Sequence, residues 1–133
     1  MLNTHYDITR GQEQSSVLVT QRLAGFCQPH DTVVLTGDLN APPSAPAVQY
    51  LTSHDKLYEA LTAAGAGGPT WIGQSFSNQL TDCKMDYIFA RRDPFTCLQG
   101  GRVITDLFGG FSVSDHAAVM AEFCLGKQCS GCK

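Results

Sequence analysis

The feature that most constrains the fold is a continuous apolar segment, Thr32-Val-Val-Leu-Thr-Gly37. Apolar residues on both alternating faces are typical of a strand that is buried on both sides. We therefore predict a buried strand over residues 32–37. This strand leads directly into the motif Gly37-Asp-Leu-Asn40, so polar side chains follow at its carboxyl end.

The rest of the chain interleaves strand and helix patterns. Residues 2–8 alternate with period two, which predicts a strand with one polar face. Thr9-Arg-Gly-Gln12 fits a capping box, and an apolar stripe predicts a helix over about 10–27. The other expected elements are a helix over about 44–53, helical turns around Leu57 and Leu61, and strands over 84–90, 96–104 and 117–124. This order predicts an α/β or α+β fold, and a chain of 133 residues supports one domain.

Composition and charge narrow the function classes. The net charge is −3, and Arg91-Arg92 is the only adjacent basic pair. A protein that holds long nucleic acids through their phosphates needs several basic residues on one face, so this class is disfavoured. No apolar run approaches the ~20 residues that cross a bilayer, and the first residues do not resemble a signal peptide. Either the protein is cytosolic or a targeting segment precedes Met1, which leaves its localisation open.

Six cysteines are many for this length, and Cys124, Cys129 and Cys132 crowd the end of the chain. Cys129-Ser-Gly-Cys132 has the C-x-x-C spacing of zinc ligands, but a structural zinc site takes four ligands and one pair indicates it only weakly. Disulfides or free thiols are the simpler interpretation of the tail. The even count permits full pairing without establishing an oxidising compartment.

Two polar motifs follow or precede apolar strands. In Gly37-Asp-Leu-Asn40, Asp38 and Asn40 point the same way if the backbone stays extended, so both can reach a hard cation and a phosphate oxygen. Taken alone, this motif is also an ordinary Asp/Asn turn. In Ser114-Asp115-His116, an acid beside an imidazole can supply a metal ligand and a base. Its alternative is a solvent-facing loop.

Two further motifs lie within predicted strands. Met85-Asp86-Tyr87-Ile88 places an acid in an apolar strand, where a carboxylate is costly to bury unless a cation or imidazole pairs with it. An edge-strand acid that faces water is the alternative. Asn3-Thr-His5 places a histidine on the polar face of the first strand, where local hydrogen bonds alone would also explain it.

In this order, the four motifs resemble the last four signature blocks of the endonuclease/exonuclease/phosphatase superfamily, the deoxyribonuclease-like metal-dependent phosphoesterases. Gly67-Gly-Pro-Thr-Trp71 is similar to a further stretch between two of these blocks. The resemblance covers residues 1–124 and leaves a Cys-containing tail, residues 125–133, outside it. It implies the C-terminal half of a four-layer α/β/β/α sandwich of two sheets.

The resemblance also implies roles for individual residues. Asp38 and Asn40 match the pair that positions the phosphate and the attacking water, and together with Asp115 they match metal ligands for Mg²⁺, or Mn²⁺ in its place. His116 matches the histidine that contacts the phosphate and acts as a base. Asp86 matches the acid that fixes the tautomer of this histidine, so the two side chains should be in contact.

His5 matches a second histidine that assists at the phosphate. The family's first half normally brings the principal Mg²⁺ ligand, a glutamate, and none of Glu13, Glu59 and Glu122 lies in a matching motif. We therefore expect an incomplete metal site, with weak turnover at most in the 133-residue chain.

The expected function is Mg²⁺-dependent hydrolysis of a phosphomonoester or phosphodiester whose class the sequence does not specify. The alternatives are a catalytically silent module that binds phosphate or a partner and, less favoured, a small zinc protein. A half sandwich should also expose apolar surface and self-associate. The residues expected to lose cover are Val33, Val34, Leu35, Ile88, Phe89, Val119 and Phe123.

Overall fold

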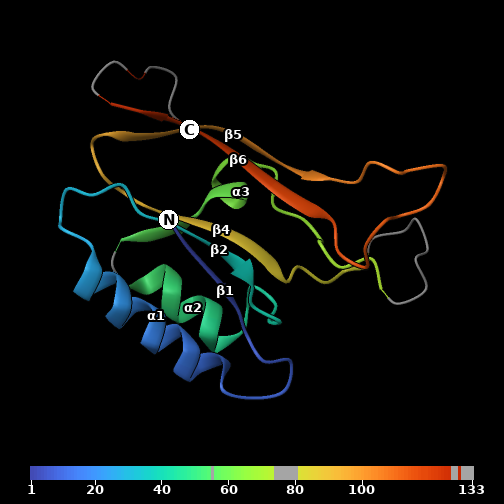
Figure 1. Ribbon diagram of the computed structural model, residues 1–133, viewed down its shortest axis with the longest axis horizontal. Coiled ribbons are helices and arrows are strands. Elements are labelled where there is room, and N and C mark those ends of the chain that lie inside the picture. The colour runs from blue at the N-terminus through green and yellow to red at the C-terminus, as the bar shows by residue number, and fades with distance from the viewer. Residues whose placement is uncertain (55, 74–80, 127–128, 130–133) are drawn as a thin grey trace.

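The computed structural model describes residues 1–54, 56–73, 81–126 and 129. Within them lie two β-sheets and three helices (Figure 1). The strands are β1 (Leu2–His5), β2 (Val34–Asp38), β3 (Leu57–Glu59), β4 (Asp86–Arg91), β5 (Thr96–Ile104) and β6 (Ala118–Leu125). The helices are α1 (Gln12–Phe26), α2 (Pro46–Ser53) and α3 (Ala60–Ala63). This is the mixed α/β, partial sandwich fold that the sequence predicts.

The first sheet has the strand order β1-β2-β4-β3, and the second is the antiparallel pair β5-β6. β1 runs parallel to β2 and places His5 opposite Asp38. β2 runs antiparallel to β4 and places Asp38 opposite Asp86. The carboxyl ends of β1 and β2 and the start of β4 therefore meet at one edge of the sheet.

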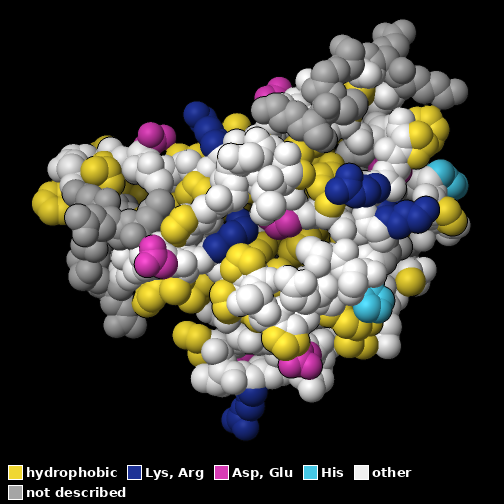
Figure 2. Space-filling model, turned by 180° about the vertical axis from the view of Figure 1, so that it is seen from behind, with side chains coloured by type: hydrophobic (Ala, Val, Ile, Leu, Met, Phe, Trp, Pro, Cys, Tyr) yellow, Lys and Arg dark blue, Asp and Glu magenta, His cyan; other side chains and the backbone are white. Residues whose placement is uncertain are grey.

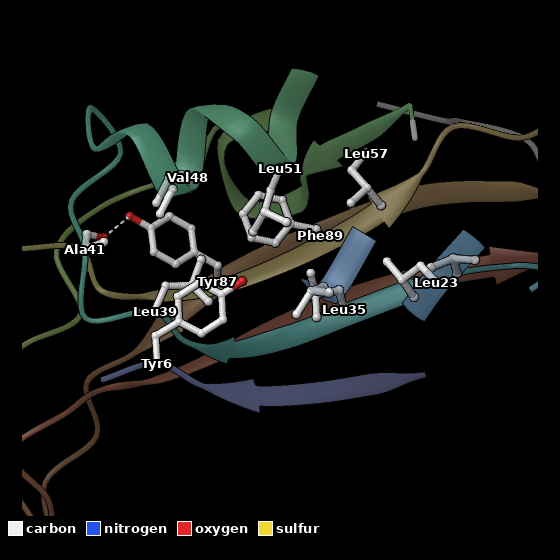
Figure 3. Packing of buried hydrophobic residues seen from close by; sticks show 13 residues of the cluster. Tyr6, Leu23, Leu35, Leu39, Ala41, Val48, Leu51, Leu57, Tyr87 and Phe89 are labelled. Carbon is white, nitrogen blue, oxygen red and sulfur yellow. Dashed lines mark hydrogen bonds between the residues drawn. The ribbon is translucent and has the colours of Figure 1, made fainter. Parts of the chain in front are cut away.

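The two faces of β4 belong to two different apolar clusters. Tyr87 and Phe89 point toward α1 and α2 and pack with Leu35 of β2 (Figure 3). The Tyr87 hydroxyl donates a hydrogen bond to the Ala41 carbonyl oxygen at 2.7 Å. Ile88 points the other way, toward α3 and the second sheet. The sheet is thus covered by helices on one face and in part by the hairpin β5-β6 on the other.

The beginning of the chain departs from the sequence prediction. The strand predicted over 2–8 ends at His5, because Asp7 turns the chain. Its carboxylate accepts hydrogen bonds from the Thr9 amide at 2.8 Å and the Thr9 hydroxyl at 2.7 Å. Since that hydroxyl is engaged, the predicted capping box is wrong. Helix α1 begins at Gln12 after Gly11, whose φ of 75° is left-handed, and no side chain caps it.

Two further expectations are corrected. Leu57 lies in β3 rather than in a helical turn, because its segment pairs with β4, and only Ala60–Ala63 is helical. The segment 32–37 is not buried on both faces. Val33 and Leu35 are buried, whereas Val34 is half-buried because the second sheet covers that face only in part.

The expected loss of cover is also wrong for most of the apolar strand residues. Val33, Leu35, Ile88 and Phe89 are buried, since the helices and the hairpin cover them. The largest exposed apolar side chains lie elsewhere, and they include Phe108 (81% exposed) and Phe111 (70%). These two exchange backbone hydrogen bonds of 3.0 and 3.1 Å around Gly109 and Gly110, which both have positive φ. We call residues 107–113 the aromatic turn.

The distribution of basic side chains on the face shown in Figure 2 is relevant to nucleic-acid partners. Its Lys and Arg side chains are dispersed among acidic and hydrophobic ones and do not form one continuous basic surface. Among the described residues, none of the helices has the length and apolar character that a membrane crossing requires.

We predict that the 133-residue chain self-associates through the aromatic turn, because the exposed side chains of Phe108 and Phe111 lie in one short turn with other exposed apolar residues, whereas a single exposed apolar residue is ordinary. Light scattering across a concentration series should show species larger than the monomer. The double substitution Phe108→Ser and Phe111→Ser should reduce them, whereas Phe26→Ser, an exposed residue at the end of α1, should not. A monomer at every concentration would contradict the prediction.

We also predict that Gly37→Ala destabilises the fold by roughly 1–3 kcal/mol. A Cβ at this position would overlap the backbone carbonyl oxygen of Thr4 on the neighbouring strand. Gly25→Ala is the matched control, because a Cβ there meets nothing within 4 Å, and in a helix it should stabilise by up to about 1 kcal/mol. Chemical denaturation measures both changes, and equal stabilities of Gly37→Ala and wild type would refute the overlap.

Candidate active site

The polar residues predicted from the four motifs meet at the edge where β1, β2 and β4 come together. A surface groove of ≈ 750 Å³ lies there. The residues that line it are His5, Tyr6, Asp7, Ile8, Asp38, Asn40, Asp115 and His116. Five of the six predicted site residues thus share one groove, and the sixth, Asp86, lies behind it in contact with His116.

Asp38 lies between two imidazoles. Its Oδ1 accepts a hydrogen bond from the backbone amide of Asn40 at 2.8 Å, and this bond turns the chain after β2. Its Oδ2 is 3.5 Å from His5 Nε2 and 3.9 Å from His116 Nε2. The carboxylate therefore faces the groove with one oxygen while the other oxygen fixes the loop.

Asn40 adopts a left-handed backbone, with φ at 46°, a conformation that asparagine tolerates better than most residues. Its Nδ2 donates to the Tyr6 carbonyl oxygen at 2.9 Å and lies 3.2 Å from His5 Nε2. Gln12 Nε2 donates to the Asn40 carbonyl oxygen at 2.7 Å. Asn40 is thus held against β1 and α1, and its side chain connects the Asp38 loop with His5.

The contact predicted between Asp86 and His116 is present. His116 Nδ1 lies 2.8 Å from Asp86 Oδ2, although 30 residues separate them. Burial lowers the pKa of His116, but the hydrogen bond and charge of Asp86, with the charges of Asp38 and Asp115, outweigh it and raise the pKa above its ordinary value. Asp86 therefore both orients the imidazole and favours its protonated form.

Three of these residues can offer ligands to one metal ion. Asp38, Asp86 and His116 each have a ligand atom, and these atoms lie within 4.8 Å of one another. Asp115 lies outside this group of three, and it is exposed, with Oδ1 3.5 Å from the Ser114 hydroxyl. It nevertheless lines the same groove as Asp38 and Asn40.

Sequence reasoning missed a buried ion pair behind the site. Lys84 Nζ lies 3.6 Å from Glu59 Oε1, and the two side chains are only 7% and 8% exposed. Burial lowers the pKa of Lys84, and the charge and hydrogen bond of Glu59 oppose this shift. Lys84 Nζ also donates to the Asp86 carbonyl oxygen at 3.2 Å. No local sequence pattern predicts this ion pair, because Glu59 and Lys84 lie far apart in the sequence.

Glu59 is therefore a structural residue rather than one in a helical stretch. It ends β3, and its carboxylate accepts from the Leu61 and Thr62 amides, which caps α3. In the tail, Cys124 forms a disulfide with Cys129. Cys129 is thus not a thiolate available to zinc, and Cys132 lies outside the described residues.

Comparison with known proteins gives one family. The model of the Endonuclease/Exonuclease/phosphatase family matches residues 3–116. No curated protein matches the chain.

Solved structures share the fold. The mannosyl-6-phosphatase Bt3783 of Bacteroides thetaiotaomicron superposes with a TM-score of 0.77 at 21% identity, over 92% of this chain and 50% of that one. D. rerio TDP2, humanized by 14 mutations, gives 0.69 at 22% identity, over 92% and 54%. The human Nocturnin catalytic domain with bound sulfate gives 0.68 at 22% identity, over 93% and 46%. The chain spans about half the length of these structures, and identities this low show the fold alone.

We predict that Asp86→Asn lowers the pKa of His116 in the metal-free chain, because it removes the charge that favours the imidazolium. The folded-state pKa of His116 is raised, so its contribution to stability is complete below the unfolded value of about 6.5 and is lost as the pH rises through the folded value. The stability advantage of wild type over Asp86→Asn should therefore shrink as the pH rises from about 6.5 through the folded-state pKa of His116.

NMR titration of the His116 ring protons and denaturation at several pH values measure the two effects. Asp106→Asn, an exposed acid that does not line the groove, is the control and should leave the His116 titration unchanged. A wild-type His116 that titrates below 6.5 would contradict the assignment.

Proposed function

The chain belongs to the endonuclease/exonuclease/phosphatase family, and from this premise we propose that it carries part of the active site of a divalent-metal-dependent phosphoester hydrolase. The observation that carries the proposal is one groove lined by His5, Asp38, Asn40, Asp115 and His116, with Asp86 in contact with His116 behind it. Carboxylates and an imidazole at one strand edge can bind a cation, a phosphate and a proton together.

In this proposal, His116 acts on the phosphate or on the attacking water. Its Nδ1 is engaged by Asp86 at 2.8 Å, so the other ring nitrogen, Nε2, is directed toward Asp38 and the groove. A neutral imidazole in this tautomer accepts a proton at Nε2, and an imidazolium donates there to a phosphate oxygen. Asp86 fixes the ring orientation, as the buried acid does in other acid–histidine pairs.

Asp38 and Asn40 would position the reacting groups on the other side of the groove. Asp38 Oδ2 faces the groove between His5 and His116, where a carboxylate can hold and deprotonate a water molecule. Asn40 Nδ2 is anchored by the Tyr6 carbonyl oxygen and lies 3.2 Å from His5 Nε2, and in this proposal its second N–H turns from His5 to a phosphate oxygen. His5 is exposed and would assist at the same phosphate.

The residues present fit a hard divalent cation. Asp38 and Asp86 face each other across the β2-β4 pairing, and opposed carboxylates are unfavourable without a neighbouring positive charge. We propose that Asp38, Asn40 and Asp115, which line one groove, hold Mg²⁺ or Mn²⁺ through oxygen ligands. When bound, such a cation neutralises charge that develops on the phosphate oxygens.

A second candidate is a module that binds phosphate or a partner without turnover. This candidate is favoured by the partial match to the solved structures, because the chain spans only 50% of the mannosyl-6-phosphatase and 46% of the Nocturnin domain. In the family resemblance, the glutamate that is the principal metal ligand belongs to the half that the chain does not match. For the 133-residue chain alone, we therefore expect trace hydrolysis at most.

We predict that Mg²⁺ or Mn²⁺ supports hydrolysis of bis(4-nitrophenyl) phosphate and that EDTA abolishes it. Because wild-type hydrolysis is expected to be a trace, Asp38→Ala and His116→Ala should each lower it to the rate of the protein-free blank, as expected when a metal ligand or a general acid or base is lost. Asp106→Asn is the matched control and should keep wild-type turnover. Circular dichroism spectra of the variants should match that of wild type.

Metal binding separates the two candidates. Line broadening of the His5 and His116 signals by Mn²⁺ should occur in wild type and weaken in Asp38→Ala. Metal binding without turnover would favour the silent module. The absence of both metal binding and turnover would refute the hydrolase assignment for this chain. Asp38→Ala with full activity would return Asp38 to the role of a turn residue.

A further inference from the structure

Asp86 lies in the first sheet, and His116 lies in the loop that leads into the second sheet. Asp86 begins β4 in the first sheet, and His116 lies two residues before β6 in the second. Within the described residues, no strand pairing joins β4 to β5 or β6. The 2.8 Å contact between Asp86 and His116 therefore depends on whatever fixes the start of β4 relative to the start of β6.

One buried residue is hydrogen-bonded to both sides of this junction. The Thr70 hydroxyl oxygen accepts from the Met85 amide and the Asp86 amide, each at 3.0 Å. The Thr70 amide donates to the Cys83 carbonyl oxygen at 2.9 Å. On the other side, the Ala117 amide donates to the Thr70 carbonyl oxygen at 2.7 Å.

The residues that follow Thr70 extend this connection. The Ile72 amide donates to the Asp115 carbonyl oxygen at 2.7 Å. Trp71 lies between these two positions and forms an antiparallel bridge with His116. The segment 70–72 thus holds the residues on both sides of His116, while the Thr70 hydroxyl holds the backbone of Asp86.

The hydroxyl of Thr70 is well suited to this role. Thr70 is fully buried, and a hydroxyl oxygen has two lone pairs, so one atom satisfies two neighbouring amides. A valine has the same shape but leaves both amides without an acceptor, whereas a serine keeps the acceptor. Unsatisfied backbone donors favour a shift of the segment that carries them.

We infer that Thr70 is a positioning residue that aligns Asp86 with His116 across the two sheets. An effect of Thr70 on catalysis rests on the proposed function. The alignment of Asp86 with His116 does not depend on it. Thr70 does not line the groove that contains His5, Asp38 and His116, so it acts through Asp86 and His116 rather than on substrate.

The test compares Thr70→Val with Thr70→Ser in the full, metal-free chain. The ring N–H of His116 that is hydrogen-bonded to Asp86 should give a downfield proton NMR signal, which Asp86→Asn removes and thereby assigns. Thr70→Val should lose or shift this signal and speed hydrogen exchange at the Met85 and Asp86 amides. Thr70→Ser should keep both properties.

Ser16→Ala is the matched control for a merely structural effect. Ser16 is also fully buried, and its hydroxyl donates to the Ala47 carbonyl oxygen at 2.8 Å, between α1 and α2. This variant should lose stability and keep the downfield signal. An unchanged signal in Thr70→Val, or its loss in Ser16→Ala, would overturn the inference.

Two further measurements complete the test. If Thr70→Val does not fold, the wild-type chain still decides, because Met85 and Asp86 amides that exchange as fast as exposed amides would overturn the inference. Where hydrolysis is measurable, Thr70→Val should lower kcat by about 10–100-fold with little change in KM, as for other residues that orient catalytic groups. The NMR measurements need neither metal nor substrate. They therefore test the role of Thr70 even if the proposed hydrolase function is wrong.

Discussion

The site is organised by two carboxylates that the β2-β4 register places opposite each other, Asp38 and Asp86. Like charges at opposed positions of a sheet repel, and the fold retains both only because positive or polar groups surround them. His116 contacts Asp86 through Nδ1 and lies near Asp38 through Nε2. His5, at the end of β1, lies on the other side of Asp38. The loop before β6, the end of β1 and the turn after β2 thus each supply a group that contacts one of the two carboxylates.

The same strands serve the core and the site, because successive side chains point to opposite faces. In β4, Tyr87 and Phe89 fill the core beneath the helices, and Asp86 and Ile88 face the other side. Gly37 shows how closely the two functions are combined, since any side chain there would meet the backbone of β1. A shift of register by one residue would exchange the core and site faces, so the apolar core fixes the position of the acids.

Sequence reasoning succeeded where a pattern had one physical solution. The strand over 96–104 has those bounds in the structure. The family resemblance, together with the cost of burying an acid in an apolar strand, correctly predicted the Asp86–His116 contact. Sequence reasoning failed where local and distant partners compete. Asp7 binds the hydroxyl that would have capped α1, and pairing with β4 makes Leu57 a strand residue. The functions of Lys84 and Thr70 depend on residues far away in sequence, which no local pattern encodes.

On the proposed function, the charge of the groove would make phosphate binding depend on metal binding. Asp7, Asp38 and Asp115 line it, with two histidines to oppose them. Hydrogen bonds from the Thr9 amide and hydroxyl, and from the Arg10 amide, lower the pKa of Asp7 and keep it ionised. A phosphate ester is itself an anion, so this groove repels it until a cation offsets the carboxylates. On the proposed function, a silent module that binds phosphate at this groove would therefore depend on the same cation as the hydrolase.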